Sequence, residues 1–230
     1  MIAMSDQKTI RITFFGDSIF VGQGVSIYRG WVTRLSQYLE SYGEQVGREL
    51  LVTNASVNGR TTRQALEDMP YTVQSHGVDI LVVQFGLNDC NYWESDKGLP
   101  RVSVDAFQAN LREIVDRGFR FGATYVILNN NHPTSRTSDI LPHTSITYEE
   151  SNQSYCEAIR ALSSTFDDKV VFKDIHSHFS DLVGSGSMTI DELLLPDGLH
   201  LSAAGHDAYL SFMKPVITQC IDHLLENTGS

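Results

Sequence analysis

The chain has 230 residues, of which 17 are lysine or arginine and 28 are aspartate or glutamate, so its formal net charge is −11. This acidic balance disfavours nucleic-acid partners, which are normally met by a basic surface. The length favours a single domain over residues 1–230. The hydrophobic content of 41% indicates a folded chain with a full core rather than a disordered one.

Neither a membrane span nor a metal-binding cysteine pattern is visible along the chain. The longest apolar runs, such as Ile80–Val83, fall far short of the ~20 residues that cross a bilayer. Residues 6–8 are polar where a signal peptide would be apolar. The three cysteines are widely spaced and match neither a disulfide framework nor a zinc site. We therefore expect a cytoplasmic protein without a membrane span. Whether it forms a homo-oligomer is left open by the sequence.

Short apolar runs alternate with longer amphipathic segments. The apolar runs are rich in Val, Ile, Leu and Phe, which is typical of parallel strands covered on both faces. They predict strands at Thr9–Phe15, Leu50–Asn54, Asp79–Phe85, Thr124–Asn129 and Val170–Phe172. The amphipathic segments have helical spacing. They predict helices at Gly30–Tyr42, Thr62–Ser75, Val104–Phe119, Ser145–Phe166 and Ala203–Leu224. Gly43, Gly77 and Gly122 follow three of these helices, where a left-handed residue often ends a helix.

This alternation predicts an α/β fold with a parallel sheet and right-handed crossovers, in which ligands bind beyond the carboxyl ends of the strands. Three successive strands end there in glycine and short polar side chains. A fourth polar segment precedes the last helix. The four segments are Gly16-Asp17-Ser18, Asn54-Ala55-Ser56-Val57-Asn58-Gly59, Gly86-Leu87-Asn88-Asp89 and Asp197-Gly198-Leu199-His200. Turn chemistry alone explains any one of them.

Together these segments hold the groups that acyl transfer requires. Ser18 is a candidate nucleophile, which needs a neighbouring base, and His200 is the candidate base. Asp197, three residues before His200, can orient the imidazole. Gly59 and Asn88 offer N–H donors for an oxyanion, with the N–H of Ser18 as a third. Taken singly, each of these residues is as readily a helix cap or a turn residue.

The four segments in this order resemble the GDSL esterase/lipase family, also called SGNH hydrolases. The segment Leu201–His206 also resembles the family's C-terminal block, and Ile19 replaces the leucine of the family's name. The resemblance implies a flavodoxin-like three-layer α/β/α sandwich with about five parallel strands. It also implies a Ser18–His200–Asp197 triad, an oxyanion hole of Ser18, Gly59 and Asn88, and no cofactor or metal.

The function we expect is that of a serine esterase acting on a small-molecule ester with a small or short acyl chain. Acetyl groups on a carbohydrate are one substrate class of this kind. A thioesterase or lysophospholipase of the same family is the alternative. From other classes, a non-catalytic binding module on a flavodoxin-like fold and a metal phosphodiesterase stay open.

Some further residues admit a functional interpretation and a plainer one. His176 and His178, with Asp174 and Asp181, suggest a metal cluster, but their spacing matches no known ligand set and favours surface or helix-start histidines. Cys90 follows Asn88 closely and is expected to be a small wall residue.

Asp17 is expected to accept hydrogen bonds that hold its turn.

Two segments are candidates for setting substrate choice. The aromatics of Asn91–Glu94 can stack on a substrate or pack against a loop. The long polar stretch Asn129–Ser145 is expected to form a lid or a subunit contact.

Overall fold

The computed structural model describes residues 9–228 and contains, within them, one parallel sheet of five strands. The strands are β1 (Ile10–Gly16), β2 (Leu50–Asn54), β3 (Ile80–Gln84), β4 (Tyr125–Asn129) and β5 (Val170–Lys173). Their order across the sheet is β2-β1-β3-β4-β5, and every neighbouring pair is parallel. This is the flavodoxin-like order, so the predicted fold class is confirmed, and all five predicted strands are present within one residue at each end.

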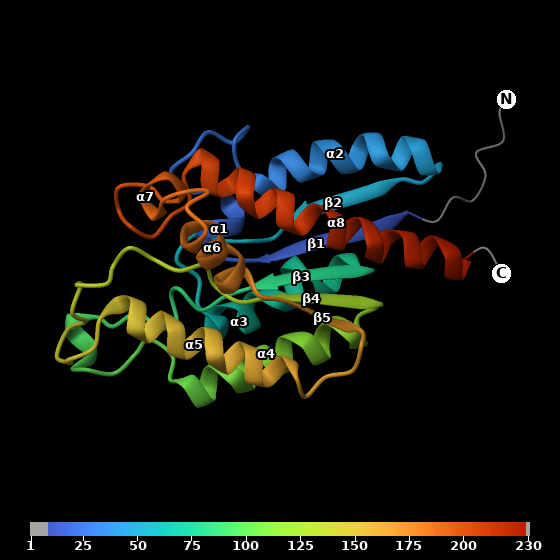
Figure 1. Cartoon of the computed structure of the whole chain (residues 1–230). Helices are drawn as coiled ribbons and strands as arrows, with labels where there is room; N and C mark the ends of the chain where they lie inside the picture. The colour runs from blue at the N-terminus through green and yellow to red at the C-terminus, as the bar shows by residue number, and fades with distance from the viewer. Residues whose placement is uncertain (1–8, 229–230) are drawn as a thin grey trace, which may run out of the picture.

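Helices cover both faces of the sheet. The helices are α1 (Ser18–Val21), α2 (Trp31–Val46), α3 (Thr62–Thr72), α4 (Val104–Arg120), α5 (Tyr148–Ser163), α6 (Ile175–Gly184), α7 (Ile190–Leu193) and α8 (Ala203–Thr228), with short 3₁₀ turns η1 (Gln74–His76) and η2 (Glu94–Asp96). Figure 1 shows α2 and α8 on one face and α3, α4 and α5 on the other, which makes three layers. No helix among residues 9–228 combines the length and apolarity needed to cross a membrane.

Aromatic side chains fill the layer between the sheet and the α2–α8 pair. The ring of Trp31 stacks on Tyr209 with centroids 4.6 Å apart, and Phe14 and Phe20 meet Trp31 edge-on at 5.3 Å and 5.1 Å. All four rings are buried. Edge-to-face and offset stacks are the preferred aromatic geometries, so this cluster fixes the N-terminus of α2 against the helix that follows the C-terminal polar segment.

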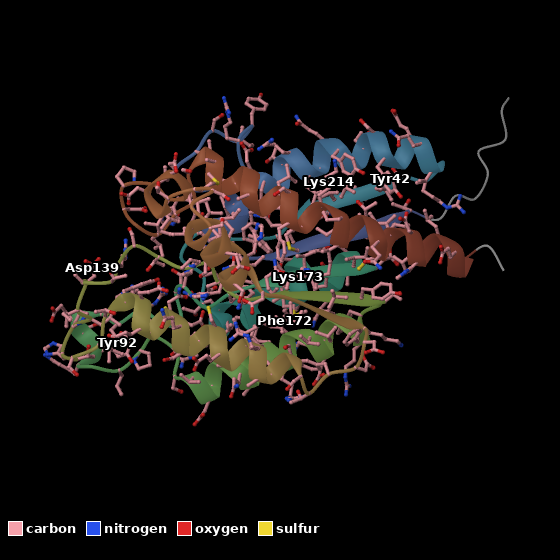
Figure 2. The ribbon with its side chains drawn as sticks, in the orientation of Figure 1. Tyr42, Tyr92, Asp139, Phe172, Lys173 and Lys214 are labelled. Carbon is pink, nitrogen blue, oxygen red and sulfur yellow. The ribbon has the colours of Figure 1, made fainter. Side chains whose placement is uncertain are left out.

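Polar groups join α2 and α8 on the outer side of this cluster. Figure 2 labels Tyr42 of α2 and Lys214 of α8, and the Tyr42 hydroxyl donates a hydrogen bond to Asp222 of α8. The Lys214 ammonium lies 3.6 Å from the ring centroid of Tyr38. The two helices thus hold together through half-buried polar contacts as well as through their buried faces.

The helix predictions were wrong at several ends. Helix α2 runs through Gly43 to Val46 and ends at Gly47, whose φ is 65°. Gly43 instead allows close packing, because a Cβ there would lie 2.6 Å from the carbonyl oxygen of Arg48. Gly77 and Gly122 do follow helical segments with positive φ, as expected.

Other helix boundaries also differ from the predicted ones. Helix α3 ends at Thr72, two residues after an internal proline, and η1 continues it. Helix α5 begins at Tyr148 rather than Ser145, because Thr147 and Glu150 form a capping box there. Helix α8 extends to Thr228. Helices α1, α6 and α7 were not predicted.

The strand register gathers the polar segments at one edge. Gly16 of β1 pairs with Gln84 of β3, which pairs with Asn129 of β4, and Phe14 pairs with Asn54 of β2. The chain therefore leaves four neighbouring strands at nearly the same level. The loops that follow lie together at the end of the sheet drawn on the left in Figure 1.

Glycine at position 205 is expected to be required for the packing of α7 against α8. A Cβ on Gly205 would overlap the carbonyl oxygen of Leu193. Gly205→Ala should lower the free energy of unfolding by about 1–3 kcal/mol, the usual cost of overpacking, as measured by urea denaturation.

Gly184→Ala is the matched control, since a Cβ at this exposed last residue of α6 meets nothing within 4 Å. This variant should be neutral or stabilised by up to about 1 kcal/mol. Equal effects of the two substitutions would contradict the packing argument.

Candidate active site

Ser18 lies at a tight turn where β1 passes into α1. It is the first residue of that helix, and Asp17, the N-cap, accepts the N–H of Ile19 at 3.1 Å. Gly22, with φ of 78°, ends the helix one turn later. Gly16 lets β1 pack closely, because a Cβ there would lie 2.8 Å from the carbonyl oxygen of Gln84. The N–H of Ser18 therefore stands at a helix start, where backbone N–H groups have no intrahelical acceptor.

His200 joins Ser18 to Asp197 in one line of hydrogen bonds. The Ser18 Oγ lies 3.0 Å from His200 Nε2, and His200 Nδ1 lies 2.6 Å from Asp197 Oδ2. The other carboxylate oxygen accepts the backbone N–H groups of Leu199 and His200, both at 2.9 Å. Burial tends to raise the pKa of Asp197, but these hydrogen bonds outweigh it and hold the pKa below its usual value. The carboxylate is therefore ionised at neutral pH.

The segment 132–136 supports the loop that carries Asp197 and His200. Ser135 donates its N–H to the carbonyl of Gly198 at 3.0 Å, and Arg136 Nε donates to the carbonyl of Asp197 at 2.9 Å. His132 Nε2 lies 2.8 Å from the carbonyl of Leu199 and donates to it. This part of the long polar stretch thus supports the loop that carries Asp197 and His200, whereas the sequence suggested a lid or a subunit contact.

A buried polar layer holds this segment in turn. Glu149 accepts the N–H and hydroxyl of Thr134 at 2.8 and 2.7 Å, and Asn152 donates to the carbonyl of His132 at 3.0 Å. Burial lowers the pKa of His132 to about 4, so its ring is neutral at neutral pH. A neutral ring carries a single N–H, and this N–H is directed at the carbonyl of Leu199.

The two other predicted site residues, Gly59 and Asn88, are brought together by a residue that sequence analysis missed. Arg101 donates to the carbonyl of Gly59 at 3.2 and 3.3 Å and to Asn88 Oδ1 at 3.5 Å. Asn88 Nδ2 donates to Asp17 Oδ2 at 3.2 Å. Gly59 has φ of 76°, which favours glycine. No motif marks Arg101, which stands 13 residues beyond Asn88.

Two buried carboxyl groups lie beneath these residues. Burial raises the pKa of Asp17 to about 7, although the N–H of Ile19 partly offsets it. Burial likewise raises the pKa of Asp89 to about 6, against the opposing hydrogen bonds from the N–H and hydroxyl of Thr62 at 2.9 and 2.6 Å. Asp17 is a structural acceptor, as predicted.

The other candidates have structural contacts. His176 and His178 lie in the first turns of α6, where His176 is 3.5 Å from Glu149 and His178 stacks on Phe212. Residues 9–228 hold no group of three or more His, Cys, Asp or Glu arranged for a metal ion. Cys90 is fully buried, and burial raises the pKa of its thiol.

Asp89→Asn should stabilise the protein above pH 6. An Asp89 carboxyl with a raised pKa is protonated more readily in the folded than in the unfolded chain, so its contribution to stability falls as pH rises from about 4 to about 6. The asparagine Oδ1 still accepts from Thr62.

Urea denaturation across pH should show equal stability of variant and wild type near pH 3. The variant should be more stable by about 2 kcal/mol at pH 8. A difference independent of pH would contradict this assignment.

Comparison with known proteins identifies the family of this chain. A family model described as GDSL-like lipase/acylhydrolase matches residues 14–208. An arylesterase from Vibrio mimicus is 27% identical over 132 residues, which are 57% of this chain and 60% of the relative. The esterase TesA from Pseudomonas aeruginosa is 27% identical over 118 residues, 51% of this chain and 53% of the relative. The chain thus matches a little over half the length of these curated relatives.

Solved structures share the fold. A lipase/acylhydrolase from Enterococcus faecalis superposes with a TM-score of 0.68 at 22% identity, covering 90% of this chain and 95% of that one. An acetylxylan esterase from Geobacillus stearothermophilus superposes with a TM-score of 0.68 at 19% identity, covering 89% of this chain and 92% of that one. With the family model spanning most of the chain, the conclusion is that this protein belongs to the GDSL-like lipase/acylhydrolase family.

Proposed function

We propose that this protein is a serine esterase that hydrolyses small or short-chain acyl esters through an acyl-enzyme on Ser18. The observation that carries the proposal is the unbroken line of hydrogen bonds from Ser18 Oγ through the ring of His200 to Asp197. A serine hydroxyl is a weak nucleophile until an adjacent base accepts its proton, and this line supplies the base and the group that orients it.

In the first step, Ser18 Oγ attacks the ester carbonyl carbon while His200 Nε2 accepts the hydroxyl proton. The ionised Asp197 holds the Nδ1–H and stabilises the imidazolium that forms. The carbonyl oxygen becomes an oxyanion, which accepts the N–H groups of Ser18 and Gly59 and the side-chain N–H of Asn88. The intermediate collapses when the C–O bond to the alcohol breaks and the imidazolium gives its proton to the leaving oxygen.

In the second step, water attacks the acyl-serine as His200 accepts one of its protons. The same donors hold the second oxyanion, and the proton returns to Ser18 Oγ as the carboxylic acid leaves. No step of this cycle calls for a metal or an organic cofactor.

The relatives support the choice of substrate class. Two are named for hydrolysis of aryl and of acetylxylan esters, so small aryl and acetyl esters are the first to be tested. Trp93 is half exposed just beyond Asn88 and offers an aromatic face near the site.

Ser18→Ala should abolish ester hydrolysis, with kcat/KM for p-nitrophenyl acetate falling by about 10³-fold or more. The reason is that no other group takes over the covalent step. Ser26→Ala is the control, because Ser26 is exposed on the loop that follows the same turn. Ester hydrolysis by Ser18→Ala at the wild-type rate would refute the assignment.

Asp197→Asn should lower kcat by about 10²–10⁴-fold. The amide oxygen can still accept the N–H groups of Leu199 and His200, but the amide nitrogen then donates to His200 Nδ1. The ring proton is thereby placed on Nε2, which can no longer accept from Ser18. Asp181→Asn removes the same charge from an exposed site and should be near wild type. Less than a fivefold loss in Asp197→Asn would count against the triad.

A further inference from the structure

The connection between β3 and α4 contains a long loop, residues 89–102, which begins and ends beside Asn88. Its two ends are joined at the base, where Val102 donates its N–H to the carbonyl of Asp89 at 3.2 Å and Arg101 donates to the carbonyl of Asn91 at 2.9 Å. Tyr92, within this loop, is labelled in Figure 2 at the end of the sheet where the site lies. The backbone of Arg101 is therefore fixed next to the third polar segment.

The guanidinium of Arg101 joins two of the three proposed oxyanion donors, Gly59 and Asn88. Both of its Nη atoms donate to the carbonyl of Gly59, which follows β2, and Nη1 also donates to Asn88 Oδ1, which follows β3. The planar fork of an arginine suits such a double contact, because several N–H groups lie in one plane. A lysine ammonium has no such plane.

These contacts decide which way the Asn88 amide faces. A guanidinium is only a donor, so it selects the amide oxygen, while the Asp17 carboxylate on the other side selects the amide nitrogen. One N–H of Asn88 is thereby used by Asp17, and the second is left for the substrate oxygen. Without Arg101, no other hydrogen bond among residues 9–228 holds the oxygen end, and the amide is held by its contact to Asp17 alone.

The charge of Arg101 also fits an oxyanion site. Asp17 and Asp89 are both fully buried beneath Asn88, and a carboxylate there repels a negative charge that develops nearby. Arg101 interacts favourably with the charge of Asp89. Its guanidinium lies 4.4 Å from the ring centroid of Trp93, a distance at which a cation is attracted to the face of the ring.

We propose that Arg101 is a positioning residue that assembles the oxyanion hole by holding Gly59 and the amide of Asn88 in their working orientation. This inference rests on the proposed esterase function and extends it to a residue outside the predicted site. Replacing Arg101 is expected to affect mainly the steps after substrate has bound, because an oxyanion exists only in the transition state and the tetrahedral intermediates.

The test is steady-state kinetics of p-nitrophenyl acetate hydrolysis by Arg101→Met and Arg101→Lys. We expect kcat to fall about 10–100-fold in Arg101→Met with KM changed less than about threefold, somewhat below the loss typical of removing an oxyanion donor outright. Arg101→Lys should recover only a small part, because an ammonium cannot hold both acceptors. Affinity for an aryl trifluoromethyl ketone, which forms a tetrahedral adduct, should fall in parallel with kcat/KM.

A double-mutant cycle separates positioning from a general structural role. In an Asn88→Ala background, Arg101→Met should cost at least threefold less than in wild type, because half of what Arg101 holds is gone. Arg63→Met is the matched control: Arg63 is exposed on α3, and within residues 9–228 it forms no hydrogen bond to Gly59 or Asn88. It should leave kcat within twofold of wild type.

Each outcome has a defined meaning. Wild-type kcat in Arg101→Met, a loss expressed in KM alone, or independent losses in the cycle would overturn the inference. If Arg101→Met does not fold, the same criteria apply to Arg101→Lys and Arg101→Gln. The proposed function fails separately, if wild type hydrolyses no ester or if Ser18→Ala stays active. If the wild type is active, Ser18→Ala is inactive and Arg101→Met is unimpaired, the proposed function stands and only the role of Arg101 is refuted.

Discussion

The carboxylate of Asp17 joins the turn that carries Ser18 to the strand end that carries Asn88. One oxygen accepts the N–H of Ile19 and the other accepts the side-chain N–H of Asn88. The group is fully buried, so its ionised form is costly and its pKa rises to about 7, while its hydrogen bonds offset part of that cost. The turn that carries Ser18 and the side chain of Asn88 therefore share a single acceptor, and the placement of each depends on the other.

The parallel register extends this constraint to residues far apart in the chain. Ser18 and His200 are 182 positions apart, yet they come within hydrogen-bond distance. β1, β2 and β3 end at nearly the same level, and α8 packs on α2 through Trp31 and Tyr209. Segment 132–136 then supports the loop that carries Asp197 and His200 from the adjoining strand end. The same packing that forms the core thus fixes the geometry of the candidate site.

The sequence was sufficient for the strands, and Ser18, His200 and Asp197, which it proposed as a site from their motifs, do lie in one line of hydrogen bonds. Fully buried parallel strands have continuous apolar runs, and short polar segments after glycine are distinctive when several occur in order. Helix α7 has only four residues, which are too few for a periodic pattern. Gly43 resembled a helix end, although it lies within α2 and its lack of a side chain allows close packing against Arg48. Arg101 could not be identified in advance, because its role depends on how residues 89–102 return to Asn88.

The most direct test of the account is covalent trapping of the nucleophile. The folded wild-type protein is treated with an alkyl fluorophosphonate, and its adduct is located by peptide mass spectrometry. We expect one phosphonyl group on the peptide that contains Ser18, and no adduct once His200 is replaced by alanine, because the hydroxyl then has no base. An unmodified Ser18, or a label carried by another residue, would contradict the claim that Ser18 forms the acyl-enzyme.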